Sequence, residues 1–163
     1  MVNVLIVCQG RRLLSQYISR SWREIKLIYK IVIPCRMPNL NDFLSAHHIG
    51  FKWKQKGKAM ILSASKGSEM KREWQKKCEL PIKNALKGRK LSTPVDIHYH
   101  YFEINKQRDK GNIHGFCEKV FEDALQTVGA ITNDGWQQIR NITTEFDVDE
   151  HNPRVEITIT EVN

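Results

Sequence analysis

One stretch, Lys106–Gln138, constrains the fold of this chain more than any other. Its apolar side chains recur at steps of three and four residues, which is the period of an α-helix with one buried face. They are Ile113, Phe116, Cys117, Val120, Phe121, Ala124, Leu125 and Val128. Asn112 is the expected N-cap, and Gly129 follows in the position that commonly ends a helix. We therefore predict a helix with one face in the core.

Two carboxylates flank this predicted helix. Asp109 lies just before it in a polar turn, and Asp134 lies after it in the turn Asn133-Asp134-Gly135. An acidic residue at a helix N-terminus has an ordinary explanation, because the helix dipole stabilises it there. Spacing alone favours that explanation for Asp109, and a role as a metal ligand stays open.

Four segments have the pattern of strands: 28–33, 94–103, 136–148 and 154–162. The segment 94–103 alternates most clearly, with Val95, Ile97, Tyr99 and Tyr101 on one side. Polar residues at 147–153 predict a hairpin turn between the last two strands.

Two further helices are expected. A short one passes through Phe43 and Leu44 and has Asn41 or Asp42 as its cap. A long basic one begins at Ser68 and ends at Gly88, and Pro81 should kink or divide it. The fold class is therefore α/β or α+β, a small mixed sheet of about four strands beside two main helices.

The length of 163 residues fits one domain, which we place at residues 28–163. Residues 1–27 are a doubtful extension, because neither an apolar start at 2–7 nor a short helix at 13–25 fits the later pattern. One hypothesis is a misassigned start, since Trp22-Arg23-Glu24 can be encoded as a purine-rich ribosome-binding sequence and Leu27 as a TTG start codon. The alternative is a real accessory helix, and mass spectrometry of the native N-terminus separates the two.

The charge of the chain is uneven. The net charge is +8, and residues 51–90 carry thirteen Lys and Arg against three Glu, whereas residues 141–163 carry six acids against one Arg. A basic part of this kind suits a nucleic-acid partner, and a merely soluble basic surface is an equally good explanation. The residues expected to contact DNA are Lys52, Lys54, Lys56, Lys58, Lys71, Arg72, Lys76, Arg108 and Lys110.

The four cysteines are far apart and form no zinc-binding pair, so we expect reduced thiols in a cytoplasmic protein. No apolar run is long enough to cross a membrane, and the apolar start is too short for that role.

Strand-borne Glu103 and the turn residues Asp109 and Asp134 would meet if the chain doubles back. Carboxylate oxygens without Cys or His ligands select Mg²⁺ or Mn²⁺, the ions used in phosphodiester hydrolysis. A basic protein with such a cluster is typical of a metal-dependent nuclease.

Several motifs together resemble the RusA family of phage-type Holliday-junction resolvases, in order from Ile28 to Val162. They are Arg108-Asp109-Lys110-Gly111-Asn112, Lys119, Asp123-Ala124-Leu125, Gly129, Asn133-Asp134-Gly135-Trp136 and the run from Asp149 to Glu156. The resemblance implies a homodimeric α/β endonuclease that binds four-way DNA junctions and cuts them with Mg²⁺ held by aspartates. It assigns Asp109 and Asp134 to the metal and Lys119 to the catalytic helix lysine.

One residue departs from the family pattern. Gly111 stands where the family has a second aspartate, and the helix is about one turn longer before Lys119. Either Glu103, Glu118 or Asp123 completes the metal site, or metal binding and cleavage are weakened. Asp123 also has a simpler interpretation as a surface partner of Lys119 at i,i+4.

Three functions are compatible with these residues. The first is a Mg²⁺-dependent endonuclease in which Asp109 and Asp134 hold the ion and Lys119 stabilises the charge on the phosphate. The second is a branched-DNA-binding protein that has lost cleavage at Gly111. The third is a small interaction module whose charge is incidental.

Overall fold

The computed structural model describes residues 26–48 and 59–162 of the chain. Within them lie three helices and four strands. In chain order these are β1 (Ile28–Ile33), α1 (Leu40–His48), α2 (Ala59–Leu86), β2 (Val95–Glu103), α3 (Lys110–Thr127), β3 (Ile139–Val148) and β4 (Arg154–Glu161). The predicted α+β class with a four-stranded mixed sheet is confirmed.

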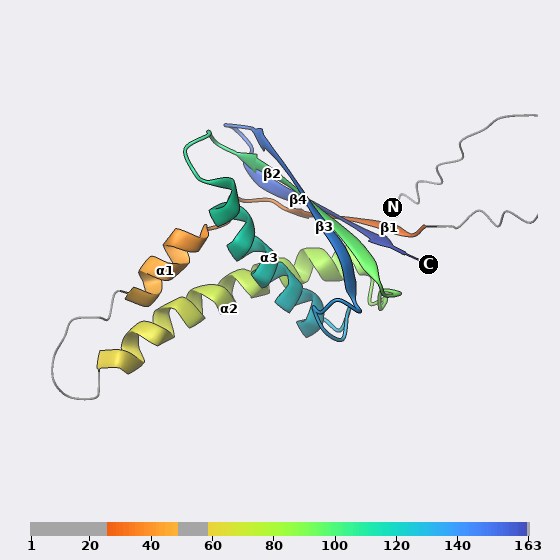
Figure 1. Ribbon diagram of the computed structural model, residues 1–163, viewed down its shortest axis with the longest axis horizontal. Coiled ribbons are helices and arrows are strands. Elements are labelled where there is room, and N and C mark those ends of the chain that lie inside the picture. Colours follow the sequence, from red (N-terminus) through yellow and green to blue (C-terminus); the bar gives the residue numbers. More distant parts are fainter. Residues whose placement is uncertain (1–25, 49–58, 163) are drawn as a thin grey trace, which may run out of the picture.

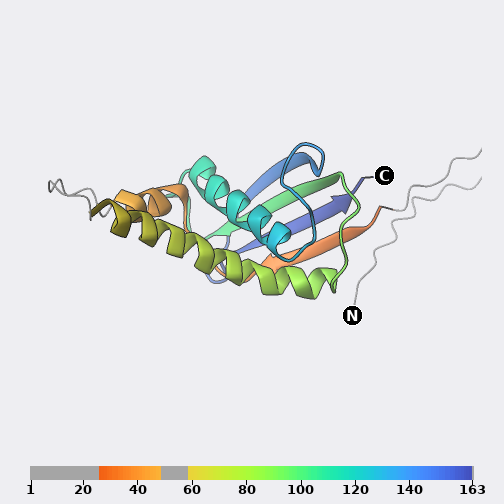
Figure 2. The same ribbon diagram turned by 90° about the horizontal axis from the view of Figure 1, so that it is seen from below.

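The strands form one sheet in the order β1-β4-β2-β3, and the helices lie on one face of it (Figures 1 and 2). β2 and β3 are parallel neighbours joined through α3, whereas β4 runs antiparallel to both β1 and β2. Two parallel neighbours need a crossover connection, and here that connection is the helix predicted from the apolar repeat.

The core fills the space between the sheet and the helices. From β2 it takes Val95, Ile97, Tyr99 and Tyr101, and from β4 Val155, Ile157 and Ile159. The predicted apolar face of α3 is buried from Ile113 to Leu125. The alternation of β2 and the helical period of α3 therefore identified the two surfaces that meet, because burial of one face fixes each period.

The predicted hairpin between the last two strands is wrong. β3 and β4 are not neighbours, because β2 lies between them and pairs with both. The connection 149–153 passes over the end of β2, where the Asp149 amide donates to the Glu103 carbonyl at 2.8 Å. Polar turn residues correctly indicate that the chain reverses, but they do not tell which strand lies between the two arms.

Three details of the helices also differ from the predictions. Asn39 caps α1, with its Oδ1 accepting from the Asp42 amide and the Asp42 carboxylate accepting from the Asn39 amide, both at 2.9 Å. Asp109, not Asn112, is the N-cap residue of α3. Pro81 does not divide α2, since Cys78 and Ile82 on either side are fully buried and packing holds the helix together.

A buried ion pair fixes the loop between β2 and α3. The carboxylate of Glu103 is 7% exposed and accepts from Arg36 Nε at 2.9 Å and from Arg108 Nε at 3.0 Å. Arg108 Nη2 also pairs with Glu103, and its Nη1 donates to the Met37 carbonyl at 2.8 Å. These contacts tie the segment before α1 to the start of α3.

Some predictions concern residues that the structure does not describe. They include the extension 1–27, apart from Lys26 and Leu27, and the four lysines at 52, 54, 56 and 58. Among the described residues, no helix combines the length and the apolar character needed to span a bilayer.

Two glycines, one inside α3 and one just after it, provide a test of this backbone. Gly129 follows the helix with a φ of +74°, whereas Gly115 lies inside the helix with open space around an added Cβ. We expect Gly129→Ala to cost about 1–2 kcal/mol of unfolding free energy, because an L side chain is strained in the left-handed region. Gly115→Ala should instead add about 1 kcal/mol through helix propensity. Urea denaturation followed by circular dichroism measures both changes in unfolding free energy. If the two variants shifted it in the same direction, the backbone conformations assigned to Gly115 and Gly129 would be contradicted.

Candidate functional site

The middle of α3 carries a group of charged side chains that we call the α3 cluster. α3 contributes Glu118, Lys119, Glu122 and Asp123, α2 contributes Lys71, and the loop after α3 contributes Asp134. The loop is held against the end of the helix, because the Ala130 amide donates to the Leu125 carbonyl at 2.9 Å. Residues from three parts of the chain therefore meet here.

The ammonium of Lys119 lies between two carboxylates. Its Nζ is 2.6 Å from Asp134 Oδ2 and 3.1 Å from Asp123 Oδ1. The hydrogen bond from Lys119 lowers the pKa of Asp134, and the same bond raises the pKa of Lys119. Lys71 Nζ approaches the other oxygen of Asp123 at 2.5 Å. The cluster thus brings two lysines to a pair of aspartates.

Glu122 is the buried carboxylate of the cluster. It is 6% exposed, and its Oε1 has no hydrogen-bond partner among the described residues. Burial raises its pKa from 4.5 to about 7, and the charges of Glu118 and Asp134 act in the same direction. A carboxylate that titrates near neutral pH is suited to accept and release protons.

A line of hydrogen-bonding groups connects the cluster to the core. Tyr101 Oη and His114 Nδ1 are 2.8 Å apart, and His114 Nε2 lies 3.3 Å from Glu118 Oε2. Burial lowers the pKa of His114. His114 is therefore held between the sheet and Glu118, where it fixes the position of that carboxylate.

The donors of the cluster belong to the class that a hard divalent cation prefers. Glu118, Glu122, Asp123 and Asp134 offer only carboxylate oxygens, as Mg²⁺ and Mn²⁺ favour, but no three of their ligand atoms lie within 4.8 Å of one another, so an ion would have to draw them together. The position of the Lys119 ammonium between two of them shows that positive charge is favourable there. Glu122 Oε1, which has no hydrogen-bond partner in the described part of the chain, is a further ligand oxygen.

Asp109 lies away from this cluster. It precedes α3 by one residue, so the helical rise puts it about 15 Å along the axis from Lys119. It accepts a hydrogen bond from Asn112 Nδ2 at 3.3 Å. The structure therefore brings Asp134 to Lys119 and Asp123, and it leaves Asp109 at the other end of the helix.

Asp109 instead lines a cavity of about 550 Å³ at the β2–α3 connection. Its charged lining comprises Glu103, Lys106, Arg108, Asp109, Lys110 and Asp147. Both oxygens of Glu103 are already used by Arg36 and Arg108, so Glu103 is not a free metal ligand. The carboxylates of this cavity outside the arginine pairs are therefore Asp109 and Asp147.

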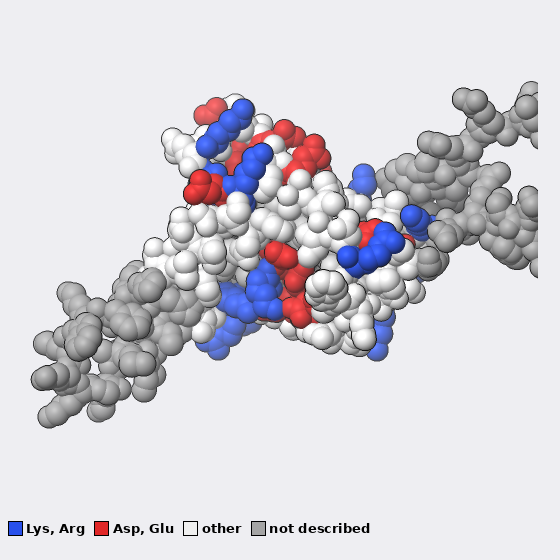
Figure 3. Space-filling view, in the orientation of Figure 1, with Lys and Arg blue, Asp and Glu red and all other residues white. Residues whose placement is uncertain are grey.

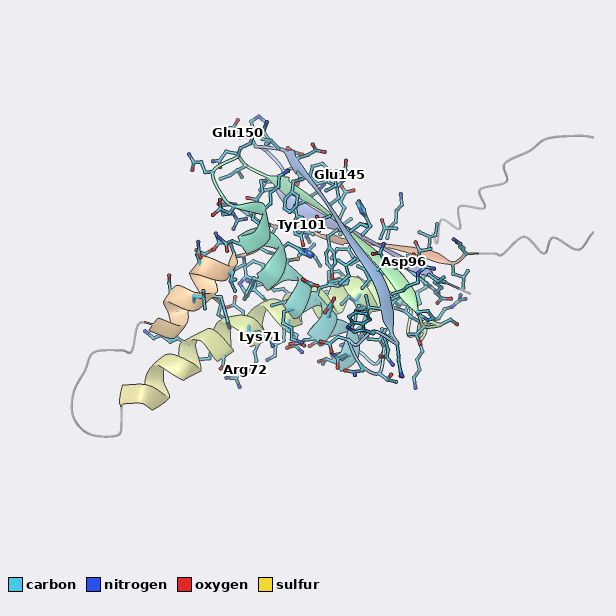
Figure 4. All side chains as sticks on the ribbon, viewed as in Figure 1. Lys71, Arg72, Asp96, Tyr101, Glu145 and Glu150 are labelled. Atoms are coloured by element: carbon cyan, nitrogen blue, oxygen red, sulfur yellow. The ribbon has the colours of Figure 1, made fainter. Side chains whose placement is uncertain are left out.

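The described residues predicted to bind DNA have different surroundings. Arg108 is occupied by Glu103 and Met37, and Lys110 Nζ lies 5.1 Å from the ring centre of Phe146. Arg72 and Lys76 are exposed on α2. Figure 3 shows basic and acidic side chains next to each other over α2 and α3, and Figure 4 shows Lys71 and Arg72 on α2. The visible face is mixed in charge, not uniformly basic.

Trp136 lies two residues after Asp134 and is 98% exposed. A large aromatic side chain left almost wholly in water is uncommon in a folded domain. A solvated indole beside charged groups offers a flat surface on which a nucleotide base can stack.

Glu122 is the functional candidate that sequence reasoning missed. One signal was present, because Glu118 and Glu122 are like charges at i,i+4, an unfavourable arrangement on a helix. Two like charges at this spacing need a nearby positive charge or a proton to offset their repulsion. Neither the helical period nor the turns beside the helix indicated which residue would supply it.

Comparison with models of known protein families finds no match to this chain, and comparison with curated protein sequences finds none either. The resemblance to the RusA family therefore stays a prediction.

The raised pKa of Glu122 gives a testable dependence of stability on pH. Between 4.5 and about 7 the folded protein holds a proton that the unfolded chain has released, so the contribution of Glu122 to stability falls as the pH rises through this range. We expect the Tm to fall more from about pH 5 to about pH 8 in the wild type than in Glu122→Gln. Glu150→Gln, at an exposed loop carboxylate, is the control and should follow the wild type. Parallel Tm profiles of the wild type and Glu122→Gln would contradict the assignment.

Proposed function

We propose that this protein is a divalent-metal-dependent endonuclease that acts on branched DNA, with the α3 cluster as its active site. The observation that supports it is the contact of one lysine with two carboxylates, Asp123 and Asp134, beside a buried glutamate whose pKa is about 7. Perturbed acids of this kind concentrate at catalytic sites.

Four residues of the cluster have roles in this proposal. Asp123 and Asp134 would hold Mg²⁺ or Mn²⁺, which when bound supplies Lewis-acid stabilisation of the phosphate and lowers the pKa of water. Lys119 neutralises charge that develops on the phosphate oxygens. Glu122, whose pKa is about 7, would take the proton from the attacking water as the new P–O bond forms and the bond to the leaving oxygen breaks.

The partner and the assembly are part of the same proposal. Exposed Arg72 and Lys76 would contact phosphates, and Trp136 would stack on an unpaired base at the branch point. A cytoplasmic homodimer would present two clusters to the two halves of a four-way junction.

Variants in the α3 cluster and at the start of α3 test where cleavage occurs. With a synthetic four-way junction and Mg²⁺, we expect Asp134→Asn and Lys119→Ala to lower the nicking rate by at least about 100-fold. Asp109→Asn should retain nicking, because Asp109 is remote from the cluster and asparagine is an equally good cap. Loss of nicking in Asp109→Asn with retention in Asp134→Asn would move the active site to the cavity at the β2–α3 connection.

A second candidate function is branched-DNA binding without cleavage. Gly111 favours it, because this exposed residue of the first turn of α3 stands where the resembled family has an aspartate. Tight junction binding, a steep dependence on salt and no nicking with either Mg²⁺ or Mn²⁺ would identify this function.

Trp136 tests the DNA interface under both functions. We expect Trp136→Ala to weaken junction binding by about 1–3 kcal/mol, the range for loss of one stacked base, and Trp136→Phe to restore most of it. The Tm should not change, because the side chain is almost fully exposed. Fluorescence anisotropy with a labelled junction measures the affinity. Equal affinity of the wild type and Trp136→Ala would remove Trp136 from the interface.

A further inference from the structure

The face of the sheet opposite the helices carries a separate group of histidine and carboxylate side chains. His98 and His100 alternate with the buried Tyr99 and Tyr101 of β2, so they point away from α3. In the parallel pairing, His98 lies beside Thr143 of β3 and His100 beside Glu145. Figure 4 shows Glu145 on this side of the sheet.

Three of these side chains are close enough to share one ion. His100, Glu145 and Asp147 each offer one ligand atom, and the three atoms all lie within 4.8 Å of one another. His100 Nε2 is 2.8 Å from Asp147 Oδ2, and its Nδ1 is 3.9 Å from Glu145 Oε2. A small contraction of exposed side chains would bring them to the distances of metal coordination.

His98 supplies a fourth donor next to this group. Its Nε2 lies 3.6 Å from Glu145 Oε2, while its Nδ1 makes a 2.8 Å hydrogen bond with Thr143 Oγ1. A hydrogen bond at one ring nitrogen is the usual way in which a protein orients a histidine that binds a metal through the other.

The surroundings also orient His100. Its ring centroid lies 4.1 Å from that of Phe102, and the guanidinium of Arg154 lies 3.7 Å from the Phe102 centroid on the same sheet face. Arg154 is itself paired with Asp149 and Glu156, each at 2.7 Å. This neighbouring positive charge is therefore already balanced.

The two carboxylates lack a permanent cationic partner. Within the described part of the chain, the ion-pair partners of Glu145 and Asp147 are the histidines alone, and no Lys or Arg contacts them. Two adjacent carboxylates of this kind favour a bound cation. The imidazoles decide its class, because mixed nitrogen and oxygen donors suit first-row transition ions such as Zn²⁺, whereas Mg²⁺ prefers oxygen alone.

We propose that His100, Glu145 and Asp147, with His98 as the fourth donor, form a binding site for Zn²⁺ or a similar first-row transition ion. The ion joins β2 to β3, which lies at the edge of the sheet formed by the described strands. Its effect is to stabilise that edge. The site is distinct from the α3 cluster, because it lies on the opposite face of the sheet and contains histidine.

Metal titration of the full-length protein tests this site. After removal of metals with a chelator and addition of excess Mg²⁺ to occupy the α3 cluster, the wild type should bind one equivalent of Zn²⁺ in competition with a chelating indicator, and its Tm should rise. His100→Ala and Glu145→Gln should each weaken binding at least tenfold and lose the rise in Tm. Glu145→Gln keeps the shape of the side chain, so loss of Zn²⁺ binding in this variant reports the lost ligand and not a folding defect.

One matched variant and one spectrum complete the design. His151→Ala removes an exposed histidine from the loop 149–153, so it should bind Zn²⁺ as the wild type does. The Co²⁺ form should lack the intense charge-transfer absorption of thiolate ligands. Absence of stoichiometric binding, unchanged binding in His100→Ala and Glu145→Gln, or a thiolate spectrum would each overturn the proposal.

Discussion

Burial of the apolar face of α3 against the sheet is the interaction on which the rest of this structure depends. Phe121 meets Tyr99 of β2 edge-to-face, with ring centroids 5.8 Å apart, and the buried residues of the helix extend from Ile113 to Leu125. Because α3 also connects β2 to its parallel neighbour β3, this packing fixes both ends of the crossover. The side of the helix that cannot enter the core is then presented with its charges at fixed positions.

The packing of α3 fixes the positions of the α3 cluster, and one residue of the cluster reduces the stability that this packing provides. Glu122 occupies the border between the buried and solvated sides of the helix, where burial disfavours its charged form. A hydrophobic residue there would pack at no such cost. A buried carboxylate beside Glu118 and Asp134 costs stability, and acids perturbed in this way concentrate at functional sites. Lys119 and Lys71 offset the remaining negative charge.

The sequence predicted the elements well and their arrangement only in part. The period of two in β2 and the helical period of α3 identified the core because each reflects burial of one face. The position of β2 between β3 and β4 could not be predicted, since long-range pairing has no local signature. The expected meeting of Asp109 and Asp134 is not found within the chain, because ten residues of helix separate Asp109 from Lys119. The partners of Glu122 come from segments distant in sequence, which periodicity does not relate.

The most direct test of the α3 cluster as the metal site is to locate bound Mg²⁺ through Mn²⁺ broadening of backbone amide signals in NMR spectra. Signals that Mn²⁺ broadens and excess Mg²⁺ restores should belong to residues 118–123 and 133–135, which surround Lys119 and Asp134. Competition by Mg²⁺ separates this site from the histidine site on the other face of the sheet, since Mg²⁺ binds imidazole poorly. Broadening that Mg²⁺ reverses at residues 106–111 instead would contradict this assignment and return the metal to Asp109.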